Sequence, residues 1–186
     1  MKRIAVIGGV HASEEALKTA EHVGYEIVKS GHILYEGGAG GVGTAARQGG
    51  LKAAQELGYD PNHVVFTCLP KFNWVKAGKS KDGYVLIMGG DWAERRRLMM
   101  EAVDGAVAIS GEGGTANEIS IGVSLKKPVI PIGGEGSAED HRFESNGCLY
   151  ISDTLAPLHA VQQVLEALGV KYEPKTVMDS KKKHSR

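Results

Sequence analysis

Short runs of apolar residues recur along the chain, and glycine follows each of them within two residues. The runs are 4–7, 33–35, 84–88, 107–109 and 129–132, and the glycines that follow are Gly8, Gly37, Gly89, Gly111 and Gly133. Continuous apolar runs of this length, bounded by turn residues, are typical of strands that are buried on both faces of a parallel sheet. The pattern therefore predicts buried parallel strands.

The intervals between these runs carry the three- and four-residue spacing of amphipathic helices. In the first interval the apolar positions are Ala16, Leu17, Ala20, Val23, Ile27 and Val28, and Ser13 is the predicted N-cap. A second stripe is Leu155, Leu158, Val161, Leu165 and Leu168, and residues 43–57, 92–103 and 115–125 are also compatible with helix. Strands that alternate with helices predict a single-domain, doubly wound α/β fold, with a mostly parallel sheet and helices on both faces.

In such a fold every strand-to-helix turn lies at one edge of the sheet, where open α/β proteins bind ligands. Glycine lets the backbone approach a ligand closely, and the first amides of a helix bind anions. The predicted phosphate- or nucleotide-binding residues are Gly8, Gly9, Gly37, Gly38, Gly41, Gly111, Gly113, Gly114 and Thr115. The alternative is that these glycines serve turn geometry alone. The Gly-Thr-Ala that recurs at 43–45 and 114–116 is too short to establish an internal duplication.

Composition narrows the class of protein. The chain has 26 glycines among 186 residues, about twice average usage. Lys plus Arg and Asp plus Glu are 22 each, so no overall field attracts nucleic acid or an anionic membrane, and we expect neither as a partner. Cys68 and Cys148 are too few for a disulfide framework or a metal site. The first apolar run is too short for a signal peptide, so we expect a cytoplasmic protein. We also expect neither a metal nor an organic cofactor.

Two glycine-rich nucleotide-binding signatures are not met in full. Neither of the two strongest turns spells a G-x-G-x-x-G that is followed by the expected ribose-binding acid, and no G-x-x-x-x-G-K-[ST] occurs. Usual NAD binding and P-loop hydrolysis are therefore disfavoured. The chain is predicted to be a single Rossmann-like nucleotide-binding domain, residues 1–170. The polar, basic segment that follows, residues 171–186, is predicted to be a flexible tail.

Arg95 and Glu118 are the candidate catalytic residues. The stretch from Asp91 to Met100 opens a predicted helix directly after Gly89-Gly90, so Arg95 should lie near the ligand edge, where its guanidinium can bind a phosphate. Arg96 and Arg97 are predicted to be solvated and paired with Glu94 and Glu101. Glu118 has two interpretations. In Thr115-Ala116-Asn117-Glu118 it fits a capping box, and as a carboxylate near the ligand edge it suits the stabilisation of a sugar cation or the activation of water.

The segment 71–83 is polar and basic, and it is predicted to be a loop or lid. Phe72 and Trp74 offer stacking surfaces for a base, or pack the loop onto the body of the protein.

The stretch from Arg95 through Asp104 to Ser110-Gly111-Glu112-Gly113-Gly114-Thr115-Ala116-Asn117-Glu118 resembles the signature of LOG-type proteins, often labelled lysine decarboxylases, in the SLOG superfamily. Their pattern is an Arg followed by P-G-G-x-G-T-x-x-E. The resemblance implies a Rossmann-like fold, usually a homodimer or higher homo-oligomer. It also implies hydrolysis of nucleoside 5′-monophosphates by Arg95 and Glu118. Other members of the superfamily implied by the resemblance carry molybdenum cofactor or sense nucleotides without turnover, which is the alternative function.

The chain departs from that pattern at two positions. Ser110 stands where the pattern has Pro, and Glu112 stands where it has the second Gly. A carboxylate about 5 Å from a phosphate costs roughly 3 kcal/mol at an effective dielectric constant of about 20. Either Glu112 points away from the ligand, or the ligand carries a different group there.

Overall fold

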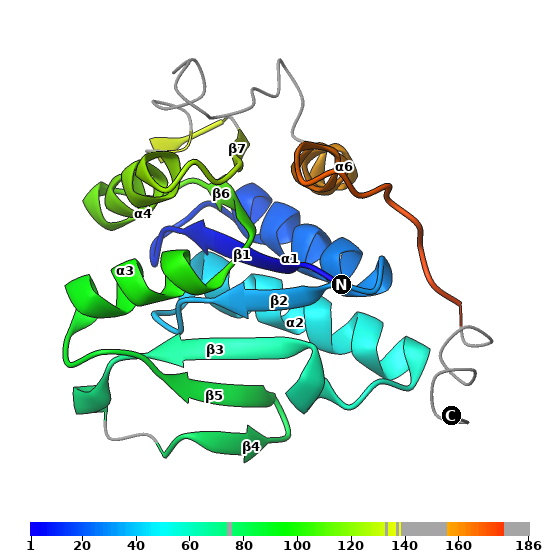
Figure 1. Cartoon of the computed structure of the whole chain (residues 1–186), viewed down its shortest axis with the longest axis horizontal. Coiled ribbons are helices and arrows are strands. Elements are labelled where there is room, and N and C mark those ends of the chain that lie inside the picture. The colour runs from blue at the N-terminus through cyan, green and yellow to red at the C-terminus, as the bar shows by residue number, and fades with distance from the viewer. Residues whose placement is uncertain (74–75, 133, 137, 139–155, 177–186) are drawn as a thin grey trace.

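The computed structural model of the chain describes residues 1–73, 76–132, 134–136, 138 and 156–176. Its strands are β1 (Arg3–Gly8), β2 (Ile33–Glu36), β3 (Val65–Leu69), β4 (Gly78–Ser80), β5 (Gly83–Ile87), β6 (Gly105–Ile109) and β7 (Val129–Ile132). They form one sheet in the order β4-β5-β3-β2-β1-β6-β7 (Figure 1). Neighbouring strands run parallel, except that the edge strand β4 is antiparallel to β5.

Helices cover both faces of this sheet, as predicted. They are α1 (Glu14–Lys29), α2 (Gly41–Leu57), α3 (Trp92–Ala102), α4 (Gly113–Ser124) and α6 (Pro157–Ala167), and the 3-10 turns are η1 (Pro61–His63) and η2 (Lys71–Asn73). Helices α1, α2 and α6 pack on one face, and α3 and α4 pack on the other (Figure 1). Ser13 is the N-cap of α1, and its side chain accepts a hydrogen bond from the Ala16 amide at 3.1 Å.

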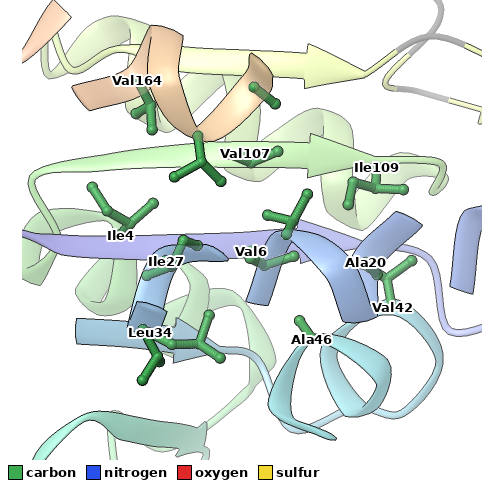
Figure 2. Packing of buried hydrophobic residues seen from close by; sticks show 14 of the residues in the cluster. Ile4, Val6, Ala20, Ile27, Leu34, Val42, Ala46, Val107, Ile109 and Val164 are labelled. Carbon is green, nitrogen blue, oxygen red and sulfur yellow. The ribbon is translucent and has the colours of Figure 1, made fainter. Parts of the chain in front are cut away.

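The central strands are apolar throughout because both of their faces are covered. Ile4 and Val6 of β1 point into the layer of α1, α2 and α6, together with Val107 of β6 (Figure 2). Ala5 and Ile7 alternate with them and point into the layer of α3 and α4. Because side chains alternate along a strand, one apolar run contributes residues to two separate cores, one on each face of the sheet. This confirms the interpretation of these runs as strands buried on both faces.

Two strands were not predicted. The run that forms β3 ends at Leu69 before Pro70 and has no glycine after it, unlike the five predicted strands. Strand β4 lies inside the segment 71–83, so the prediction of a loop for that whole segment is wrong. Its sequence is Gly-Lys-Ser, with Lys79 and Ser80 exposed, and it pairs with the sheet through its backbone at an edge.

The chain reverses direction across the sheet between β1 and β6. From β1 it proceeds outward through β2 and β3 to β5, then returns to place β6 on the other side of β1. Because Gly8 pairs with Ile109 in register, the turns that follow these two strands emerge side by side. A Cβ on Gly9 would lie 3.1 Å from the Cα of Gly111. This is the switch point at which doubly wound sheets bind ligands.

After α6 the chain continues along α1. The Lys175 amide donates to the Lys29 carbonyl at 2.7 Å, and the Tyr172 hydroxyl donates to the Glu26 carboxylate. The domain boundary at residue 170 stays a prediction, and residues 177–186 of the predicted tail lie outside the described residues. Of the helices in the described part, none is both long and apolar enough to cross a membrane.

Candidate functional site

A pocket of about 410 Å³ opens at the switch point of the sheet. Its walls come from the turn after β1, the turn after β2, and the helices α3 and α4. The residues that line it are Gly8, Gly9, Val10, His11, Ala39, Trp92, Arg95, Arg96, Glu112, Gly114, Thr115 and Glu118. Small-molecule sites have volumes of about 300–1,000 Å³, so the space suits a ligand of nucleotide size.

The structure brings together most, but not all, of the predicted site residues. Gly8, Gly9, Arg95, Gly114, Thr115 and Glu118 line the main pocket. Gly37 and Gly38 line a smaller adjoining cleft, which shares Gly8, Arg95 and Glu118 with it. Gly41, Gly111 and Gly113 are not among the lining residues of either space. Gly41 supports the site from behind, because its backbone has a φ of 49° and a Cβ there would lie 2.2 Å from the Gly9 carbonyl oxygen.

Arg95 and Glu118 form an ion pair at the floor of the pocket. Arg95 Nη1 lies 2.8 Å from Glu118 Oε1, and the two side chains are 5% and 7% exposed. The guanidinium also lies over the Trp92 ring and against Gly37, where a Cβ would come within 2.8 Å of Nη1. Burial raises the pKa of Glu118, and the positive charge of Arg95 opposes this shift.

The capping-box interpretation of Glu118 is wrong. Helix α4 begins at Gly113 with Glu112 at the N-cap, so Thr115 already lies inside the first turn. The Glu118 carboxylate accepts a hydrogen bond from Arg95 instead of reaching back to the start of the helix. Glu118 therefore lines the pocket and does not cap the helix.

Arg96 is the residue that the sequence analysis misplaced. Arg97 pairs with Glu101 at 2.6 Å and with Glu94 at 4.0 Å, as predicted for a solvated side chain. Arg96 is partly buried and lines the pocket, and it has no ion pair with any residue in the described ranges. Among the described residues its Nε, like that of Arg95, is buried without a hydrogen-bond partner. A Cβ on Gly114 would lie 3.5 Å from Arg96 Nη1, so this cation lies close to the first turn of α4.

The start of α4 leaves backbone donors available. The amides of Gly113 and Gly114 lie in the first turn, where no carbonyl four residues earlier belongs to the helix. The helix dipole adds partial positive charge at the same place. In the described part of the chain, apart from the two neighbouring residues and the backbone of α4 itself, no atom lies within 4 Å of the position of a Cβ on Gly113. Arg96 and these amides thus form a donor set for an anion.

Other helix ends near the pocket are capped by the chain itself. The Ser13 amide at the start of α1 donates to Glu135 Oε1 at 3.0 Å, and Asp91 caps α3 by accepting from the Glu94 amide at 2.8 Å. At the start of α2 the Val42 amide donates to the Gly9 carbonyl. Helix α4 thus differs from α1 and α3, whose first turns are capped by the side chains of Ser13 and Asp91, because Glu112 makes no such hydrogen bond.

The turn between β6 and α4 explains one departure from the LOG-type pattern. Ser110 has a φ of 54° and Gly111 a φ of 98°. Proline is held near a φ of −65°, so the residue expected from the pattern does not fit this backbone. The Ser110 side chain is buried, and its carbonyl accepts from the Ala138 amide at 3.2 Å. The turn is therefore built differently from a Pro-Gly-Gly turn.

Glu36 holds the turn after β2 in place, a role that the sequence analysis did not identify. Its fully buried carboxylate accepts hydrogen bonds from the Gly38 amide at 2.7 Å and from the Thr67 hydroxyl. Arg47 Nη1 lies 3.8 Å from the same carboxylate. These contacts hold the backbone of Gly37 in place, and the Arg95 guanidinium packs against this glycine.

Trp92 is the aromatic residue that lines the pocket. Phe72 packs edge-on against it, with ring centroids 6.1 Å apart, so Phe72 joins its segment to the body of the protein and is not among the lining residues. Trp74 lies outside the described residues. The described part of the chain contains no group of three or more His, Cys, Asp or Glu side chains that could hold a metal ion.

Comparison with known proteins agrees with this architecture. The family model described as the SLOG cluster4 family matches residues 1–159. A protein of Archaeoglobus fulgidus, described only as uncharacterized, is 30% identical over 138 residues, which are 70% of this chain and 83% of that protein.

Two solved structures are similar in fold. The Moco carrier protein from Chlamydomonas reinhardtii is 25% identical with a TM-score of 0.67, and the match covers 89% of this chain and 98% of that one. The molybdenum cofactor binding protein from Rippkaea orientalis is 23% identical with a TM-score of 0.70, over 91% and 98% of the two chains.

Proposed function

The chain belongs to the SLOG cluster4 family, and on this premise we propose that it binds a phosphorylated small molecule with a flat ring, either a nucleotide or the molybdenum cofactor. The phosphate lies between Arg96 and the first amides of α4. The ring system occupies the remainder of the pocket, toward Trp92 and the turn after β1. The likeness to a Moco carrier protein supports a binding function.

The observation that carries this proposal is the unpaired Arg96. Arg95 already neutralises Glu118, so its positive charge is not available for a phosphate without giving up that contact. Arg96 lines the same pocket and forms no ion pair with any described residue, although its charge acts on Glu118 at longer range, and its guanidinium lies near Gly114. Arg95 Nε and Arg96 Nε are both buried without a hydrogen-bond partner among the described residues, which is costly for each, so the ion pair and not Nε distinguishes the two arginines.

Calorimetric titration with AMP, GMP and a phosphorylated pterin tests the proposal. We expect saturable binding of at least one of them. Arg96→Gln should weaken it by about 10- to 100-fold, because a hydrogen bond to a charged group contributes about 1.5–3 kcal/mol. Arg97→Gln is the matched control, since Arg97 is the neighbouring arginine but pairs with Glu101 away from the pocket. Equal effects of the two substitutions, or no binding of any ligand, would refute the assignment.

Hydrolysis of a nucleoside 5′-monophosphate is the second candidate function. The observation in its favour is that Glu118 lines the pocket as a buried carboxylate held by Arg95. In this proposal the bond between the sugar C1′ and the base nitrogen breaks, water supplies the hydroxyl group to C1′, and a proton passes to the base. Glu118 offsets the positive charge that develops on the sugar, and Arg95 orients that carboxylate.

Chromatography of free base and ribose 5-phosphate separates catalysis from binding. If the chain is a hydrolase, the wild type releases free base from at least one nucleoside monophosphate. Glu118→Gln should then lose at least about 100-fold of that rate, while it retains ligand binding. If neither protein releases base across a panel of nucleoside monophosphates that bind, the hydrolase proposal falls and the binding proposal stands.

A further inference from the structure

Two glycine-rich turns lead into helices beside the pocket, one after β6 into α4 and one after β2 into α2. Helix α2 begins at Gly41, and its N-cap residue Gly40 makes no side-chain capping bond. The amides of Gly41 and Gly43 lie in the first turn of α2, where the helix dipole adds partial positive charge. The cleft at this turn shares Arg95 and Glu118 with the main pocket. The backbone alone would therefore offer the ligand a second anion-binding end.

Glu36 places a carboxylate of the chain itself at that end. It is fully buried, and its Oε2 accepts a hydrogen bond from the Gly38 amide at 2.7 Å. A Cβ on Gly43 would lie 2.6 Å from the same oxygen, so the carboxylate lies directly beside the first turn of α2. The Thr67 hydroxyl donates to Oε1 and holds the group in place. Glu36 therefore lies at the positive end of α2, where the phosphate of a ligand would otherwise bind.

The charge of this carboxylate is only partly compensated. Arg47 Nη1 lies 3.8 Å from Glu36 Oε1, and the Arg47 side chain is 28% exposed. Arg95, which lines the cleft, is already paired with Glu118. A second phosphate in the cleft would thus lie close to a buried negative charge. At a separation of about 6 Å and an effective dielectric constant of about 20, this repulsion would weaken binding by about 100-fold before Arg47 offsets part of it.

We infer that Glu36 determines the specificity of the pocket, because it acts as an internal anion at the start of α2 and excludes a second phosphate group from that position. The inference rests on the proposed function, in which the phosphate of the ligand binds at α4. The pocket then takes a ligand with a single phosphate group, and a diphosphate gains no affinity from its second one.

Titration with inorganic phosphate and pyrophosphate, and with AMP and ADP, tests this role. The variant is Glu36→Gln, which removes the charge but keeps the size of the side chain. Each diphosphate should bind the wild type no more tightly than its monophosphate. In Glu36→Gln the affinity for the diphosphate relative to the monophosphate should rise at least about tenfold. If only the phosphorylated pterin binds directly, competition of phosphate and pyrophosphate with it gives the same ratio.

This ratio separates specificity from a purely structural role, which would weaken the binding of both probes alike and leave their ratio unchanged. Arg47→Gln is the second variant, because it leaves the Glu36 carboxylate uncompensated but keeps its hydrogen bonds from Gly38 and Thr67. It should lower the relative affinity for the diphosphate by about 3- to 10-fold. Glu56→Gln is the matched control, since Glu56 is an exposed carboxylate near the other end of α2 that pairs with Lys29. It should keep the ratio of the wild type.

The inference is overturned if the wild type binds pyrophosphate or ADP more tightly than the corresponding monophosphate, or if Glu36→Gln leaves the ratio unchanged. If Glu36→Gln does not fold, Arg47→Gln decides, and an unchanged ratio in that variant overturns the inference. In each of these cases phosphate-dependent binding through Arg96 still stands. Loss of phosphate-dependent binding in the wild type overturns the proposed function as well, so the two failures are distinguishable.

Discussion

The ion pair between Arg95 and Glu118 holds two charges where water has little access, which makes the folded state sensitive to the loss of either. Arg95→Gln leaves the buried Glu118 carboxylate without its ion-pair partner and with only the longer-range charge of Arg96 to offset it, at a cost of about 3–5 kcal/mol near neutral pH. Burial already raises the pKa of Glu118, and removal of Arg95 raises it further. Because the folded pKa then lies above the unfolded one, stability is gained as the pH falls. The penalty in urea unfolding should therefore shrink between pH 8 and pH 5.

Arg97→Gln provides the comparison for this experiment. Its side chain is half exposed, and its pairs with Glu94 and Glu101 lie on the surface, so its cost should be within about 1 kcal/mol at either pH. A penalty for Arg95→Gln that is the same at pH 5 and pH 8 would contradict the assigned role of the pair.

The sequence distinguishes Arg96 from Arg97 by the acidic residues that stand three or four positions away along the helix. Arg97 has Glu94 three residues before it and Glu101 four residues after it, the spacing at which helical ion pairs form. At the corresponding positions around Arg96 the residues are Trp92, Ala93, Met99 and Met100, none of which is acidic. The partners of Arg97 were therefore predictable. The proximity of Arg96 to Gly114 was not, because it depends on how α3 packs beside α4.

At the scale of elements, a glycine after an apolar run identified a strand only where the turn needed glycine. Strand β3 ends at Leu69 and is followed by Pro70 instead of glycine, so it was missed, although four of its five residues are buried. Helix α4 begins at Gly113, two residues before the predicted start, because Glu112 takes the N-cap position without a side-chain bond. That small shift moves Glu118 from a capping role into the pocket.

Strand order decides which of the glycine-rich turns meet. The turns after β1, β2 and β6 converge on Arg95 and Glu118, since these three strands are neighbours in the sheet. The turn after β5 lies two strands beyond β2. Gly134, in the turn after β7, lines a separate pocket with Ser13 and Ser110. The sequence places all five turns at one edge, but it contains no pairing information that orders the strands, so the expectation of a single shared site was too broad.

At the scale of the whole molecule, the two sides of the sheet at which its strands begin and end carry different parts of the protein. The carboxyl ends of the strands carry the pocket, whereas the N-terminus lies at the opposite edge (Figure 1). There, His32 precedes β2, and its Nδ1 accepts a hydrogen bond from the Lys2 amide at 3.0 Å. The segment that follows α6 returns to this edge through Lys175. Stability and ligand binding should therefore respond separately to changes at His32.

His32 gives the fold a specific dependence on pH. Burial lowers its pKa from the ordinary 6.5 to about 4, helped by the N-terminal amino group, Lys175 and Lys2. The unfolded chain takes up a proton on His32 below about pH 6.5, and the folded chain does so only near pH 4, so stability falls as the pH drops through this window. The shift corresponds to about 3 kcal/mol.

Urea unfolding between pH 7 and pH 4 should show this loss in the wild type, and His32→Gln should show correspondingly less of it. Substitution of the exposed His63 should leave the pH dependence unchanged, and nucleotide affinity measured at pH 7 should be the same in all three proteins. A wild-type slope retained in His32→Gln would assign the pH dependence to other groups and would remove the link between burial at this edge and folding.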